Sequence, residues 1–234
     1  MLESNISALE LIKMHVQTLY IHDESSRIIS INDWNGGIAP RFYLGRTQQG
    51  NIWRFRSDLP EELSLQLTSL CKSEPFAVSG RPTFEAEYLN ILSAHSPIKQ
   101  IWFGPAYHFP DDITHSPESI PIHINNSSFL QDELQDWISD VPYQQPFMAI
   151  IVDEIAVALC ASVRITSTAH EAGVETALSH RRKGYAVKVV SAWAKAVKAI
   201  GAVPLYSTSI ENIASQKVAE SLKLTKYGSD FHVT

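Results

Sequence analysis

Three consecutive basic residues stand before a glycine at the predicted start of a helix. Arg181, Arg182 and Lys183 precede Gly184, and an apolar stripe with helical spacing begins at Ala186. The first amides of a helix have no partner inside the helix, and together with the helix dipole they favour an anion. Gly184 carries no side chain that would block close approach, and Ala186 keeps the next turn small. The segment therefore predicts a binding loop for a phosphate or pyrophosphate group.

The spacing of this loop differs from two common nucleotide-binding motifs. Lys183 precedes the glycine, and no second glycine stands at the upstream position that GxxxxGK[ST] requires. The GxGxxG spacing of dinucleotide-binding loops does not occur here either. The segment fits the pattern [RQ]xxGx[GA] through Arg181, Gly184 and Ala186. Because that pattern is short, its meaning depends on the elements around it.

Hydrophobic periodicity places the loop between a strand and a helix. The expected elements are a hairpin at 147–152 and 155–165, a strand at 171–178, a helix ending at Gly201, a strand at 203–209, a helix at 212–222 and a strand at 227–233. This series is β-β-β-loop-α-β-α-β.

Strict alternation along residues 155–165 predicts two different faces for this strand. One face is apolar and packs a core, whereas the other consists of Ala156, Ala158, Cys160, Ser162 and Arg164. Small side chains allow a helix or a ligand to approach closely. Arg164 at the end of this face either binds a substrate carboxylate or pairs with Glu171 or Glu175.

The first hundred residues predict an additional α/β region. They contain a helix starting near Ser4, a hairpin at 41–56, a helix capped at Asp58 and a helix at 83–94. A further helix is expected near 128–139. We therefore divide the chain into an N-terminal α/β region, residues 1–97, and a C-terminal domain, residues 98–234.

The C-terminal series of elements resembles the GNAT superfamily of acyl-CoA-dependent N-acyltransferases. In that family a [RQ]xxGx[GA] loop binds the pyrophosphate of coenzyme A, and an asparagine begins the next helix, as Asn212 does here. The resemblance covers residues 146–234. A smaller subfamily with a long N-terminal extension is similar over more of the chain, in residues 41–60, 104–110, 171–176 and 206–222.

The resemblance implies an α/β fold with a mixed sheet, the GNAT-like acyltransferase fold, to which the N-terminal region is an addition covering the acceptor side. The cofactor enters where the sheet splays between its fourth and fifth strands. The implied cosubstrate is acetyl-CoA, with no metal. The implied cofactor-binding residues are Thr176, Ala177 and Leu178 on the fourth strand, Arg181, Arg182, Lys183, Gly184, Tyr185 and Ala186 in the loop, and Asn212 and Ser215 on the following helix.

The implied reaction is direct attack of an amine acceptor on the acetyl group, with a general base that takes the proton of the amine. Glu171 is the expected base, because family members often place a glutamate upstream on the fourth strand. Simple spacing from Arg181 selects His170 instead, and a bulge in that strand would reconcile the two positions. Glu175 is the third alternative.

The acid that protonates the departing thiolate is not assigned by the family pattern. Many members place a tyrosine seven residues after the motif asparagine, and this position is Ala219 here. Tyr185, Tyr206 and Ser215 are substitutes, and the thiolate of coenzyme A can also leave without assistance. Ala219 keeps an alternative open, in which the chain is a non-catalytic acyl-CoA-binding sensor or protein-interaction module.

Composition and charge exclude several other classes of protein. A net charge of −6 argues against a nucleic-acid partner. No segment reaches the roughly 18 apolar residues of a membrane span, and the nine histidines lack metal-site spacings such as HExxH. Cys71 and Cys160 are expected to be buried thiols, and residues 1–10 lack the pattern of a signal peptide. We expect a cytoplasmic protein with a small-molecule or peptide amine acceptor.

Overall fold

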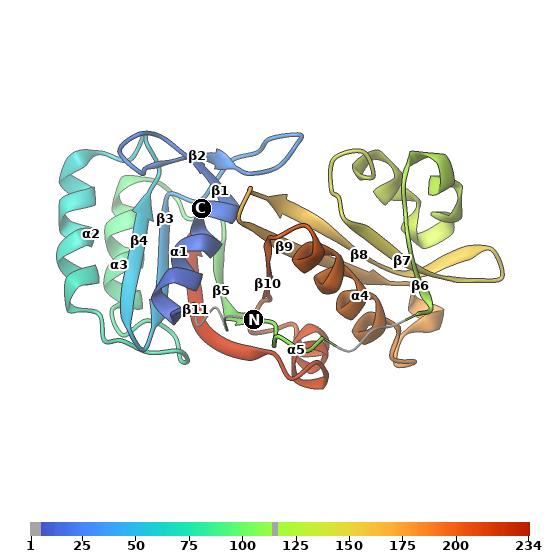
Figure 1. Cartoon of the computed structure of the whole chain (residues 1–234). Helices are drawn as coiled ribbons and strands as arrows, with labels where there is room; N and C mark the ends of the chain where they lie inside the picture. Colours follow the sequence, from blue (N-terminus) through green and yellow to red (C-terminus); the bar gives the residue numbers. More distant parts are fainter. Residues whose placement is uncertain (1–5, 114–116) are drawn as a thin grey trace. The chain divides into compact units, whose positions relative to one another are not determined.

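The computed structural model describes residues 6–113 and 117–234, which divide into two compact units (Figure 1). Unit 1 comprises the described residues up to His108, together with Ser207–Ile213 and Lys226–Thr234. Unit 2 comprises Phe109–Tyr206 and Ala214–Thr225. The boundary predicted at residues 97/98 lies inside unit 1, and the chain re-enters this unit twice near its end.

Unit 1 is built on strands in the order β4-β3-β11-β5. The predicted hairpin is present as β3 (Phe42–Thr47) and β4 (Gly50–Phe55), and β3 also pairs antiparallel with β11 (Thr225–Val233). The fourth strand in this order is β5 (Ile101–His108). A separate two-stranded ribbon consists of β1 (Tyr20–His22) and β2 (Ile28–Ile31).

Helices cover both faces of this sheet. On one face, α2 (Glu61–Ser73) and α3 (Glu85–His95) bury Leu67, Tyr88 and Leu92 against apolar side chains of β3 and β11. On the other face, α1 (Ala8–Leu19) brings Ile12 so close to Gly45 of β3 that a Cβ at Gly45 would lie 2.5 Å from it.

Side-chain caps decide where the first two helices begin. Helix α1 begins at Ala8, because Ser7 and Glu10 form a reciprocal capping box, and the predicted start at Ser4 lies outside the described residues. The predicted cap at Asp58 is wrong. Its carboxylate pairs with Arg56 at 2.7 Å, and α2 begins at Glu61 without a side-chain cap.

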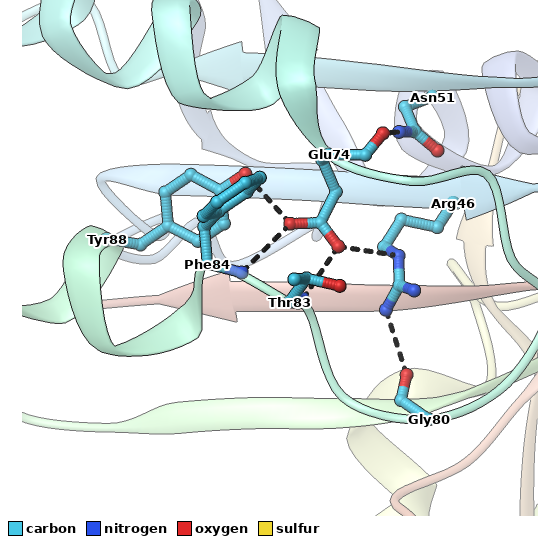
Figure 2. Close-up of polar contacts among 7 residues, drawn as sticks. All are labelled: Arg46, Asn51, Glu74, Gly80, Thr83, Phe84 and Tyr88. Carbon is cyan, nitrogen blue, oxygen red and sulfur yellow. Dashed lines mark hydrogen bonds and ion pairs between the residues drawn. The ribbon is translucent and has the colours of Figure 1, made fainter.

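A buried carboxylate at the end of α2 joins the helices of unit 1 (Figure 2). Glu74 accepts hydrogen bonds from the amides of Thr83 and Phe84 at 2.7 and 3.2 Å. It accepts a third from the hydroxyl of Tyr88 at 3.2 Å. The carboxylate therefore fixes the start of α3 relative to the end of α2.

The same group is joined to the sheet by Arg46 of β3. The Arg46 guanidinium is 3.4 Å from the Glu74 carboxylate, and it also donates to the carbonyl of Gly80 at 2.8 Å. Asn51 of β4 donates to the Glu74 carbonyl at 2.7 Å. Because Arg46 and Glu74 are both buried, each charge requires the other.

Glu74→Ala is expected to lower the free energy of unfolding by about 3–5 kcal/mol, because it leaves the Arg46 charge buried without its partner. Urea denaturation would measure the change. Glu62→Ala, at an exposed position of α2, is the matched control and should change stability by less than about 0.5 kcal/mol. A loss below about 1 kcal/mol at Glu74 would contradict the account of this cluster.

A second polar cluster of unit 1 contains His232. Its ring stacks on Trp102 with a centroid distance of 5.6 Å, and Trp102 donates to Asp230, which also contacts His15 at 3.4 Å. Burial lowers the pKa of His232 from 6.5 to about 4, with Asp230 opposing this effect and His15 adding to it. His232 is therefore neutral near pH 7.

The folded state should lose stability as the pH falls below 6.5, because the unfolded chain binds a proton at His232 that the folded chain rejects down to about pH 4. His232 contributes at most about 3 kcal/mol to this decrease in the free energy of unfolding. Urea denaturation at pH 7 and pH 4.5 would measure it. His232→Gln should flatten the pH dependence, and an unchanged slope in this variant would contradict the assignment.

Unit 2 is built on a sheet with strand order β10-β9-β8-β7-β6. Its strands are β6 (Ser119–Pro121), β7 (Phe147–Val152), β8 (Ile155–Ile165), β9 (Ala169–Thr176) and β10 (Val203–Ser207). Strands β6 to β9 are antiparallel neighbours, whereas β10 is parallel to β9. Helices α4 (Tyr185–Ala199) and α5 (Ile213–Ser221) complete the predicted series of elements.

The two faces of this sheet have different covers (Figure 1). Helix α4 packs against β7, β8 and β9, and its Trp193 donates a hydrogen bond to Ser162 of β8. The opposite face is covered by two 3-10 helices, η1 (Ile124–Phe129) and η2 (Asp132–Asp140), which replace the helix predicted near 128–139. Leu159 and Ala161 of β8 point to this side.

Two register shifts interrupt the alternation predicted for β8. Val157 and Val163 are extra residues relative to the neighbouring strands. At each of them, the side chains of β8 therefore exchange the faces that strict alternation would give them. Ala156 therefore joins Leu159 in the core on the 3-10 helix side. Arg164 pairs directly with Glu171 and shares its face, so the prediction that Arg164 lies on the face of Ser162 is wrong.

Both cysteines, Cys71 and Cys160, are buried and free, as predicted. Burial raises the pKa of the Cys71 thiol to about 12. Within residues 6–113 and 117–234, no helix is long and apolar enough to cross a bilayer.

Candidate functional site

Strand β9 has neighbours on both edges along its first residues and on one edge thereafter. The parallel ladder with β10 runs through Val203↔Ala169, Pro204↔His170 and Leu205↔Glu171 and then ends, whereas β8 pairs with β9 as far as Thr176. Within the described part of unit 2, residues 172–176 thus have no strand partner on the β10 side. Backbone amides and carbonyls on that edge, apart from the Thr176 carbonyl, which accepts from Arg181, are available to a ligand.

The chain leaves the sheet directly after Thr176. The Ala177 amide still bonds the Val157 carbonyl at 3.0 Å, and Leu178–His180 then forms a 3-10 turn. The Leu178 amide donates to Glu133 at 2.9 Å. Of the three residues predicted on the strand, Thr176 alone lies on it, because the chain must turn away from the sheet to reach α4.

Consecutive backbone amides at the start of α4 have no acceptor. Lys188 is the first residue of the helix whose amide is bonded, to the Gly184 carbonyl at 3.3 Å. Across the described residues, no acceptor contacts the amides of residues 182–187. Arg182 and Gly184 adopt left-handed conformations, with φ of 62° and 81°, on either side of Lys183. Such alternation turns successive amides inward into an anion-binding nest.

The side chains of this loop leave the amides accessible and add positive charge. Arg181, Arg182 and Lys183 are exposed, and no described carboxylate pairs with them. The Arg181 Nε donates to the Thr176 carbonyl at 3.2 Å, which holds the guanidinium group of this side chain beside the end of β9. The space around Gly184 is open, with no atom within 4 Å of an added Cβ. The loop can therefore bind a phosphate or pyrophosphate.

Glu171 lies on the face of β9 opposite α4, at the last pair of the β9–β10 ladder. Its side chain is buried, with the residue 3% exposed, and Arg164 stands directly across the β8–β9 ladder. The bulge expected in β9 is not found there, because the extra residue at this register shift is Val163 of β8. The bulge therefore does not shift His170 into the place of Glu171.

His170 points to the opposite side of the sheet, toward α4. Its Nδ1 is 2.8 Å from the Ser162 hydroxyl, which accepts a hydrogen bond from the Trp193 indole at 3.0 Å. All three groups are satisfied when Ser162 donates to Nδ1, which places the ring proton of neutral His170 on Nε2. Burial lowers the pKa of His170. With its basic nitrogen already engaged, His170 is poorly placed to take a proton from a substrate.

The residues predicted near the pantetheine arm fall in different units. Tyr206 is buried and its hydroxyl lies 2.6 Å from that of Ser215 on α5, so these two predicted residues meet within unit 2. Asn212 lies in unit 1, directly before α5, and its amide donates to the Ser209 carbonyl at 3.0 Å. Ala219, at the position where the family has a tyrosine, is buried.

Trp137 of η2 was not singled out by the sequence analysis. Its indole Nε1 donates to Glu175 of β9 at 2.6 Å. The far end of the indole lies over Gly173. No local motif indicates this contact, because it joins residues 38 positions apart. Across the described ranges, no cluster of three or more potential metal-ligating side chains occurs.

Residues 127–227 match a family model described as GNAT acetyltransferase. No protein of curated function matches the chain. A solved structure of a GCN5-related N-acetyltransferase-like protein from Streptococcus suis is similar at 15% identity, over 97% of this chain and 100% of that chain, with a TM-score of 0.50. A GCN5-related N-acetyltransferase from Kribbella flavida is 15% identical over 98% of this chain and 95% of its own, with a TM-score of 0.49.

A third structure, a GNAT-family protein from Novosphingobium aromaticivorans, is 15% identical over 58% of this chain and 66% of its own, with a TM-score of 0.48. At this level of identity the Streptococcus suis structure indicates a shared fold. The family match rests on residues 127–227, which contain β7 to β10, the anion-binding loop and both helices of unit 2. Over these residues, fewer than half of the chain, the protein is similar to the GNAT family of acetyltransferases.

Proposed function

We propose that this protein is an N-acetyltransferase that transfers the acetyl group of acetyl-CoA to an amine acceptor. The observation that carries the proposal is the row of unengaged amides at residues 182–187, next to a strand that loses its partner after Glu171. Along the chain, an open strand edge is followed directly by a site suited to an anion. This order suits a ligand that has a pyrophosphate at one end and an amide-containing arm at the other.

In this proposal the amides of residues 182–186 bind the pyrophosphate, and Arg181, Arg182 and Lys183 supply charge. The pantetheine amides pair with the open edge of β9 as an added strand would. Thr176 and Ala177 remain proposed contacts. Leu178 contributes through its exposed side chain, since Glu133 occupies its amide. Ser215 and Asn212 remain proposed contacts of the arm.

Glu171 acts as the general base. It removes a proton from the acceptor ammonium, and the free amine attacks the acetyl carbonyl carbon. The C–N bond forms, the C–S bond breaks, and the sulfur leaves as a thiolate. The nitrogen, which is positively charged after the attack, releases its second proton to solvent and the thiolate takes one up, so the products are the amide and the free thiol. A backbone amide on the open edge of β9 stabilises the developing oxyanion. The hydroxyl pair Tyr206–Ser215 is the proposed proton source for the thiolate.

A second candidate function follows from Ala219. A buried alanine replaces the family tyrosine, which suits a non-catalytic acyl-CoA-binding sensor or interaction module. Both functions require acetyl-CoA binding, so turnover separates them.

Glu171→Gln should lower turnover at least 100-fold near neutral pH, because the amide cannot accept the proton, while acetyl-CoA affinity stays within threefold. Release of coenzyme A thiol in the presence of an amine would measure turnover, and calorimetry would measure binding. Glu154→Gln, on the exposed β7–β8 turn, is a control with the same change in charge. Unchanged turnover in Glu171→Gln would remove Glu171 from the mechanism.

Gly184→Val should weaken coenzyme A binding at least tenfold, because a branched side chain would stand where the phosphates approach the amides. Gly201→Val is a matched control. Gly201 ends the same helix region with φ of 83° and, like Gly184, has open space around an added Cβ. Both variants should lose about 1–2 kcal/mol of stability through the left-handed backbone. Equal coenzyme A affinities in the two variants would contradict the assignment of the loop.

A further inference from the structure

A carboxylate of η2 holds the turn that leads from β9 into the row of unengaged amides. Glu133 accepts a 2.9 Å hydrogen bond from the backbone amide of Leu178, the first residue of the 3-10 turn and 45 positions further along the chain. The carbonyl of Leu178 in turn accepts from the Arg181 amide at 3.3 Å. Leu178 therefore connects η2 with the residue directly before the unengaged amides of residues 182–187.

The direction in which this turn leaves the sheet depends on two amides that are bonded to other elements. Within the turn, the His180 amide donates to the Ala177 carbonyl at 2.9 Å, which closes it on itself. The Ala177 amide is bonded to the Val157 carbonyl of β8 at 3.0 Å, and the Leu178 amide is bonded to Glu133. A shift of Leu178 would therefore move the start of the loop with it.

Helix η2 is itself fixed, so its carboxylate is a firm partner for the turn. Leu134, next to Glu133, is fully buried in the core on the 3-10 helix side. Trp137 packs edge-on against Phe147 with a centroid distance of 6.0 Å, and its Nε1 donates to Glu175 of β9 at 2.6 Å. Core packing and a bond to the strand thus hold η2 on both sides of Glu133.

We propose that Glu133 is a positioning residue of the cofactor site, which holds the Leu178 amide so that the amides of residues 182–187 face the pyrophosphate. The inference rests on the proposed function, in which these amides bind the pyrophosphate of acetyl-CoA. The second contact of η2, from Trp137 to Glu175, lies before the point where the chain leaves the sheet, and the contact of Glu133 lies after it. Helix η2 therefore clamps the exit of β9 on both sides.

Charge and position predict opposite effects at Glu133. A carboxylate close to a phosphate site lowers the affinity of the site for an anion. On charge alone, removal of the carboxylate should therefore strengthen the binding of acetyl-CoA. If Glu133 acts by position, its removal should weaken binding, because the amides no longer stand where the phosphates approach. A carboxamide keeps an acceptor oxygen and loses the charge, so Glu133→Gln separates the two effects.

The test is calorimetric titration with acetyl-CoA and with S-acetylpantetheine, which lacks the pyrophosphate. Glu133→Ala should weaken acetyl-CoA binding at least fivefold, whereas Glu133→Gln should bind it within twofold of the natural protein or more tightly. The affinity for S-acetylpantetheine should stay within twofold in both variants, because the effect acts through the loop. Asp136→Ala removes an exposed carboxylate from the same helix and should leave both affinities within twofold.

Amide hydrogen exchange at Leu178 gives a readout that needs no cofactor. Its rate should rise in Glu133→Ala and stay near the natural rate in Glu133→Gln, and an unchanged rate in Glu133→Ala would overturn the inference. Unchanged or tighter acetyl-CoA binding by Glu133→Ala, or equal weakening in the two variants or for the two ligands, would also overturn it and leave the cofactor site in place. Absence of acetyl-CoA binding in the natural protein would overturn the proposed function, and the inference with it.

Discussion

The parallel ladder between β9 and β10 ends after three residue pairs, and the features of the candidate site follow from this limit. Up to Glu171 the strand is bonded on both edges, which holds the proposed base in a buried and rigid place. Beyond it, one edge of β9 is open as far as Thr176, where the chain turns into the loop before α4. The loop then presents unengaged amides at residues 182–187. The proposed base, the open strand edge and the proposed anion site thus follow one another along a single segment of the chain.

Register determines which of two adjacent side chains can act on a substrate. His170 and Glu171 point to opposite faces of β9, and His170 is engaged by Ser162, which is itself bonded to Trp193. The extra residue Val163 turns Arg164 toward Glu171. The same face then carries Glu175 and the indole of Trp137. The bulge on β8 therefore adds Arg164 to the polar face of the neighbouring strand.

The order of elements and the loop were predictable from the sequence, because helical periodicity and the glycine after three basic residues are local signals. The face on which each side chain of β8 lies was not predictable, because a bulge reverses the alternation of side chains and the residue types do not indicate where a bulge occurs. The strand β9 was predicted two residues too late along the chain because Ala177 and Leu178 suit a strand, yet the chain must turn there to reach α4. The contact of Trp137 with Glu175 and the cluster around Glu74 depend on residues distant in sequence, which no local pattern reveals.

The most direct test of the account is calorimetric titration of the protein with acetyl-CoA and, in parallel, with S-acetylpantetheine, which lacks the pyrophosphate and the adenosine. If the amides of residues 182–187 supply the binding of the phosphates, acetyl-CoA should bind with micromolar or tighter affinity, S-acetylpantetheine at least 100-fold more weakly, and the difference should shrink as salt is added. Equal affinities for the two compounds, or no binding of acetyl-CoA, would contradict the account.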